Sequence, residues 1–95
     1  MPDLPKHKFA RVTSSAKVAD ASRLYAMMIV GGSGAAGTLK VMNTANGSGD
    51  PTVECAAVTG ATTFVDFSLL GPVILTTALY VTLAGSGAVA YVWYD

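Results

Sequence analysis

The chain has 95 residues, and its six basic and six acidic side chains give a formal net charge of zero at pH 7. This length allows one domain, and zero net charge excludes a binding mode that relies on bulk charge, such as nonspecific attachment to nucleic acid or to an acidic membrane surface. Charged residues make up only 13% of the chain, about half of the fraction usual in soluble domains, so we expect another molecule to cover part of its surface.

The first eight residues are expected to form an extended arm that precedes a single domain over residues 9–95. Two prolines, Pro2 and Pro5, disfavour a helix in this segment. The only cluster of basic side chains in the chain begins here and consists of Lys6, His7, Lys8 and Arg11. We predict that this cluster contacts a neighbouring subunit or an acidic surface, with a solvated terminus as the plainer interpretation. No apolar signal-peptide core follows the first residues, which favours synthesis in the cytoplasm.

The first half of the domain predicts four strands separated by turns. Residues 23–30 are apolar at nearly every position, as in a strand that is buried on both faces. Residues 14–22 show no clear period, and we expect irregular structure there. Glycine-rich residues 31–37 and the turn-forming residues 46–51 are expected to be loops. The predicted strands of this half are 9–13, 23–30, 38–43 and 52–58.

The second half predicts further strands over residues 62–69, 73–76, 79–84 and 88–94. Asp66 lies among phenylalanines in the first of them, and we interpret it as an outward-facing charge that protects a sheet surface or edge. Seven or eight short strands with regular turns and no convincing helix indicate an all-β fold. We predict an antiparallel β-sandwich with jelly-roll or immunoglobulin-like connectivity.

Residues 69–94 carry no charge and are long enough to suggest a transmembrane helix. Two breaks argue against that interpretation, Gly71-Pro72 and Gly85-Ser86-Gly87, and the residues between them are rich in strand-forming types. No Lys or Arg flanks the stretch to orient it in a membrane. We therefore predict a hairpin of residues 79–84 and 88–94, closed at the second break. A similar pattern at residues 24–35 suggests two matching hairpins that pack face to face.

No set of residues predicts catalysis, a metal or a cofactor. Cys55 is the only cysteine, and we expect it to behave as a small buried hydrophobe. Residues 32–37 match the spacing G-x-G-x-x-G, but no helix pattern follows them, so the dinucleotide fingerprint is incomplete. With His7 as the only histidine, no Ser-His-Asp set and no metal-ligand cluster can be assembled. The sequence therefore predicts a protein that is not an enzyme.

Aromatic side chains gather near the end of the chain and are the best candidates for a contact surface. They are Tyr80, Tyr91, Trp93 and Tyr94. Packing in the core or between subunits of an oligomer is the simpler interpretation. Stacking of a carbohydrate on an exposed ring is the alternative. A nucleic-acid platform is disfavoured because no exposed aromatic series accompanies the basic cluster.

Several segments resemble the small β-sandwich virion proteins of tailed bacteriophages. The resemblance covers residues 22–94 and is carried by five features. These are Arg23-Leu24-Tyr25 at the start of a strand, a glycine-rich loop, Leu39-Lys40-Val41-Met42-Asn43, a Gly-Pro step before Leu79-Tyr80-Val81-Thr82-Leu83, and a closing Gly-Ser-Gly hairpin that ends in Tyr94.

This resemblance implies a structural protein without catalytic activity, made in the host cytoplasm and located on the virion surface. A capsid decoration or cement protein is the main expectation. It would act as a dimer or trimer and bind the major capsid protein by non-covalent contacts. The alternative is a module of a tail fibre or head fibre that recognises a host glycan or a partner protein.

Overall fold

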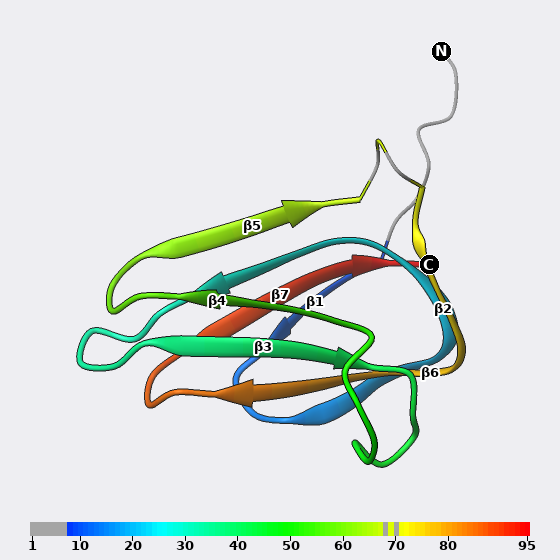
Figure 1. Ribbon diagram of the computed structural model, residues 1–95, viewed down its shortest axis with the longest axis horizontal. Helices are drawn as coiled ribbons and strands as arrows, with labels where there is room; N and C mark the ends of the chain where they lie inside the picture. Colours follow the sequence, from blue (N-terminus) through cyan, green and yellow to red (C-terminus); the bar gives the residue numbers. More distant parts are fainter. Residues whose placement is uncertain (1–7, 68, 70) are drawn as a thin grey trace.

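A computed structural model describes residues 8–67, 69 and 71–95 of the chain (Figure 1). These residues form seven strands and contain no helix. The strands are β1 (Lys8–Val12), β2 (Ala16–Val30), β3 (Gly37–Met42), β4 (Val53–Ala57), β5 (Thr62–Asp66), β6 (Val73–Ala84) and β7 (Val89–Tyr94). Every pair of neighbouring strands is antiparallel. The predicted all-β antiparallel fold is therefore confirmed.

One continuous hydrogen-bonded sheet contains all seven strands, in the order β1-β7-β2-β6-β3-β4, with β5 added beside β2. The 15 residues of β2 make this continuity possible. Its first half pairs with β6, and its second half pairs with β7 on one side and with β5 on the other. The sheet therefore folds over itself into two layers. One layer contains β4, β3, β6 and the start of β2, and the other contains β5, the end of β2, β7 and β1 (Figure 1).

The prediction of irregular structure over residues 14–22 is wrong from Ala16 onward, because β2 begins there. Against β6, the register of β2 shifts between Lys17 and Ala19 and again between Asp20 and Ser22. Each such irregularity breaks the alternation of inward and outward side chains by which a strand is recognised in a sequence. Local polar contacts also hold this segment, since Lys17 pairs with Asp20 and the Ser22 hydroxyl donates to the Asp20 carbonyl.

The predicted hairpin near the end of the chain is also wrong, although both of its strands exist. Strand β6 is one continuous strand that replaces two predicted ones, and it pairs with β2 and β3, whereas β7 pairs with β1 and β2. Residues 85–88 therefore carry the chain from one layer to the other. Glycines with positive φ, here Gly85 and Gly87, suit such a crossover as well as they suit a hairpin turn. Within the described part of the chain, no helix could cross a membrane.

The glycine-rich segment between β2 and β3 makes the same kind of crossover, and the two crossovers lie against each other. A Cβ atom on Gly32 would collide with the backbone oxygen of Ser86, and one on Gly85 would collide with the backbone oxygen of Ala36. The strands that they connect also pair with each other, β2 with β7 and β3 with β6. The similar sequence patterns therefore mark two similar units, β2 with β3 and β6 with β7, whose strands pair with each other by hydrogen bonding. They do not form two hairpins stacked face to face.

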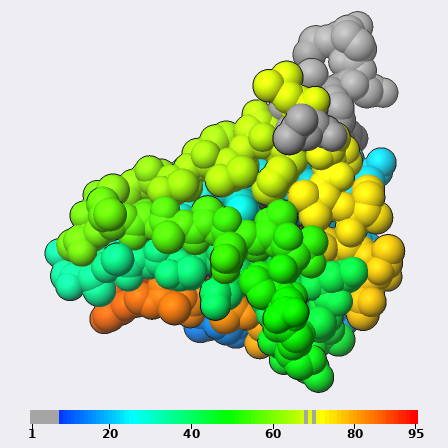
Figure 2. Space-filling model, in the orientation of Figure 1, coloured from blue at the N-terminus to red at the C-terminus, as the bar shows by residue number. Residues whose placement is uncertain are grey.

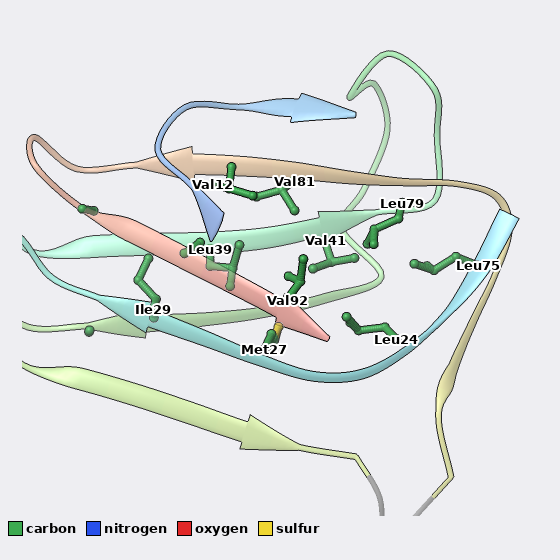
Figure 3. Close-up of a cluster of buried hydrophobic side chains, with 13 residues drawn as sticks. Val12, Leu24, Met27, Ile29, Leu39, Val41, Leu75, Leu79, Val81 and Val92 are labelled. Atoms are coloured by element: carbon green, nitrogen blue, oxygen red, sulfur yellow. The ribbon is translucent and has the colours of Figure 1, made fainter. Parts of the chain in front are cut away.

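The core lies between the two layers (Figure 3). Its largest fully buried side chains come from four strands: Leu24, Met27 and Ile29 of β2, Leu39 and Val41 of β3, Leu75, Leu79 and Val81 of β6, and Val92 of β7. Among the described residues, no polar or charged residue is buried. Because strand side chains alternate in direction, filling this core also determines which residues each layer presents outward.

Candidate interaction surface

The outer face of the β1-β7-β2-β5 layer presents two rows of side chains. In one row, Phe9, Trp93, Ala26 and Asp66 are opposite one another across the four strands. In the second row, the residues opposite one another are Arg11, Tyr91, Met28 and Phe64. Cross-strand partners share a face of the sheet, so both rows point away from the core. We call these eight residues the aromatic face.

The rings of the aromatic face contact one another. Phe9 stacks on Tyr91 with ring centroids 5.6 Å apart and contacts Trp93 at 5.1 Å. On the other side, Phe64 meets Trp93 at 5.7 Å with nearly perpendicular ring planes. The side chains of Phe9 and Phe64 each remain 54% exposed. The result is a continuous apolar patch whose rings position one another, a feature typical of surfaces that bind a partner.

The outer face of the other layer has a different character. Lys40 of β3 lies opposite Glu54 on one side and Thr82 on the other. Thr38, two positions earlier on the same face, lies opposite Ala56 and Ala84. Figure 2 shows this side of the molecule, where β4 and the loop between β3 and β4 cover much of the view. Small and charged side chains form this part of the face, and the next pair along it is Met42 and Tyr80, whose ring lies against Gly47. The two strongly exposed aromatic rings, Phe9 and Phe64, belong to the opposite face.

The four aromatic residues proposed from the sequence separate into three places. Tyr91 and Trp93 lie together on the aromatic face. Tyr94 points to the other side of β7 and packs against the core. Tyr80 belongs to β6 in the other layer, and its ring lies so close to Gly47 that a Cβ atom there would collide with it. Closeness in sequence suggests one group, but it cannot separate the two sides of a strand or assign strands to layers.

Two of the aromatic rings on this face, Phe9 and Phe64, are not among the contact residues that the sequence predicts. They lie far apart along the chain, and only the order β1-β7-β2-β5 brings them to the two sides of Trp93. A signal was nevertheless present in each strand. Phe9 shares a strand face with Arg11, and Phe64 shares one with Asp66. An aromatic ring on the charged face of a strand is a candidate for exposure.

The basic cluster is only partly described. Lys6 and His7 lie outside the described residues. Lys8 is the first residue of β1 and so belongs to a strand and not to the predicted arm, and Arg11 lies in β1 as expected. Both side chains are exposed, and Arg11 lies at the β1 edge of the aromatic face.

A polar cluster joins the end of β7 to β2. Arg23 donates from Nε to Oδ1 of Asp95 at 2.9 Å and from Nη2 to Oδ2 at 2.7 Å. The Tyr25 hydroxyl donates to the same Oδ2 at 2.9 Å, and the backbones of Arg23 and Asp95 exchange two hydrogen bonds of 3.0 Å. This geometry raises the pKa of Arg23 through its hydrogen bond and charge contact with Asp95. We interpret the cluster as a structural contact that holds the end of β7 against β2.

The Tyr25 hydroxyl is expected to lose its proton at a higher pH than that of an ordinary tyrosine. Burial raises the pKa of its hydroxyl most, and the hydrogen bond to Asp95 raises it further. The neutral hydroxyl therefore stabilises the fold below the ordinary tyrosine pKa, and this contribution disappears as the pH rises through the raised pKa. An absorbance titration of tyrosinate should contain a late component that Tyr25→Phe removes. Asp95→Asn should move this component to lower pH; an unchanged position would contradict the assigned role of Asp95.

The remaining candidates for chemistry stay separate. Cys55 of β4 is partly buried, and burial raises the pKa of its thiol. The segment that resembled a phosphate loop leads directly into β3, so no helix N-terminus follows it. Asp66 is exposed on the aromatic face. Among residues 8–67, 69 and 71–95, no three His, Cys, Asp or Glu side chains lie close enough to hold a metal ion.

The fold and the surface define a small antiparallel all-β protein with one aromatic outer face. No known protein family matches the chain, and neither a curated protein nor a solved structure is significantly similar to it.

Proposed function

We propose that this chain is a non-catalytic structural protein that acts by binding other proteins through its surface. The observation that carries the proposal is the concentration of exposed aromatic rings on one face of the sheet. Exposure of such an apolar patch to water is unfavourable in an isolated protein, whereas assembly with a partner removes this surface from water. The low charged fraction of 13% supports the same conclusion.

The energetic gain from covering this face is substantial. A phenylalanine side chain offers roughly 200 Å² of surface, and Phe9 and Phe64 are each 54% exposed. Covering both would remove roughly 200 Å² of apolar surface from water. At ~25 cal/mol/Å² this burial contributes about 5 kcal/mol before the costs of association are subtracted.

The specific role that we propose is capsid decoration. In this role the chain binds the lattice of a phage head from outside, as a dimer or trimer in contact with the major capsid protein. The resemblance over residues 22–94 supports this assignment, and so does the absence of a buried polar site in the described residues. Assembly by non-covalent contacts requires surface complementarity and no catalytic group.

A glycan-binding fibre module is the second candidate, and the arrangement of the rings disfavours it. A sugar stacks on the open face of an aromatic ring. Here Trp93 is contacted by Phe9 on one side and by Phe64 on the other, and Phe9 itself stacks on Tyr91. Interlocked rings of this kind present edges and a ridged surface, which suits a protein partner better than a sugar ring.

Particle binding tests the proposal. The tagged chain, produced where its own virions assemble, is expected to sediment with intact particles and to be visible on their outer surface by electron microscopy. Phe64→Ser should weaken this association, because it removes an exposed ring from the aromatic face. The matched control is Val58→Ser, which removes a 71% exposed apolar side chain between β4 and β5. A chain that never sediments with particles, or that binds a glycan array through Trp93, would contradict the proposal.

A further inference from the structure

We infer that the aromatic face binds the same face of a second copy of this chain, about a two-fold axis that runs parallel to the strands between β7 and β2. The inference rests on the proposed structural function and identifies one of its partners. In this arrangement the strand order of the partner is reversed, so that β7 lies over the partner's β2 and β1 lies over the partner's β5. Packed sheets of this kind keep their strands roughly within 30° of each other.

Side-chain size favours this axis over the other in-plane choice. Trp93 and Ala26 occupy the same row, as do Tyr91 and Met28. A two-fold axis parallel to the strands places Trp93 over the partner's Ala26, the smallest side chain of β2 on this face. Ala26 is only 8% exposed, so the incoming ring rests on this covered position and against the partner's Trp93 and Phe64 rings beside it. It places Tyr91 over the partner's Met28, a flexible side chain that adapts to a ring. An axis perpendicular to the strands would instead press the bulky β7 residues against each other.

Charge favours the same arrangement. Arg11 lies at the β1 edge of the aromatic face, and Asp66 lies at the β5 edge. Reversal of the strand order places Arg11 over the partner's Phe64, beside the partner's Asp66. A guanidinium over an aromatic ring is attractive, and a nearby carboxylate adds to that attraction. The perpendicular axis would bring the two Arg11 side chains to one edge, where like charges repel.

The size of the face sets the expected strength. Four strands about 4.8 Å apart and five residues with a rise of ~3.3 Å span a plane of roughly 19 by 16 Å. Such a plane is smaller than the ~800 Å² per partner of a standard interface, even after its side-chain relief is counted. We therefore expect a weak dimer in solution, with a dissociation constant on the order of 100 µM, which becomes fully populated where a lattice holds two copies together.

Sedimentation equilibrium on the full chain tests the dimer over protein concentrations from about 5 to about 1,000 µM. The unaltered chain should shift from monomer to dimer within this range. Arg11→Glu alone and Asp66→Lys alone should each weaken the dimer by roughly tenfold. The double variant should recover much of the loss, because the two exchanged charges lie beside each other across the interface. Lys40→Glu makes the same kind of charge change on the opposite face and should leave dimerisation unchanged.

Two results would overturn the inference. The first is a chain that stays monomeric at the highest concentration, and the second is a dimer in which Arg11→Glu and Lys40→Glu have equal effects. Circular dichroism of every variant separates these results from loss of fold. The particle experiment keeps the two proposals distinguishable. A monomer that still sediments with particles through Phe64 would assign the aromatic face to the capsid, whereas a dimer that ignores particles would contradict only the decoration role.

Discussion

Gly32→Ala is expected to lower the free energy of unfolding by about 3 kcal/mol, because a Cβ atom at this position has no space. It would collide with the backbone oxygen of Ser86 and would crowd the backbone carbon of Gly87 in the opposing crossover. A backbone oxygen cannot rotate away as a flexible side chain can, so the two crossovers would have to separate. Their separation would disturb the ends of all four strands that they connect.

Gly34→Ala is the matched control, since it makes the same chemical change in the same loop. A Cβ atom on Gly34 would meet nothing within 4 Å, and its φ is not in the left-handed region. Alanine restricts the unfolded chain more than glycine does, so this variant should be neutral or more stable by up to about 1 kcal/mol. Urea denaturation measures both variants through the midpoint at constant slope. Equal midpoints for the two variants would show that the crossovers do not lie in contact.

The sequence predicts where the strands of this protein lie better than it predicts which strands pair with each other. Alternation correctly located β3 and β4, because each turns one regular face to the core. The same reasoning failed for the first half of β2, where two register shifts break the alternation. It also failed at Gly85-Ser86-Gly87. A local sequence encodes the reversal of the chain. Whether the next strand then pairs with the preceding one or crosses to the other layer depends on strands that are distant in the sequence.

The candidate surface illustrates the same limit. Tyr91 and Trp93 could be proposed from the sequence, because they are neighbours on one face of one strand. Their contacts with Phe9 and Phe64 depend on the pairing of β1 with β7 and of β2 with β5. Position in the chain groups Tyr80 and Tyr94 with them, and the fold places both elsewhere. Register, and not composition, decides which aromatic residues form a surface.

Leu24→Ala is expected to destabilise the protein by about 4 kcal/mol, near the upper end of the range for buried leucine. Leu24 is fully buried and lies where β2 passes from one layer to the other. Its position in β2 pairs with Val73 of β6 and also with Tyr94 of β7. The backbone is therefore held from both sides, and the surrounding structure cannot collapse into the space that the missing side chain leaves. A cavity that stays open costs more than one that partly refills.

Two leucines provide the comparison that tests this reasoning. Leu69→Ala removes a side chain that is 96% exposed and should change the free energy of unfolding by no more than about 0.5 kcal/mol. Leu79→Ala removes an equally buried leucine from within β6, where β2 alone pairs with that position. We expect Leu24→Ala to exceed Leu79→Ala in urea or thermal denaturation, because only Leu24 lies where three strands meet. A larger loss at Leu79 would mean that the core between the layers, and not the passage of β2 from one layer to the other, limits the stability of the fold.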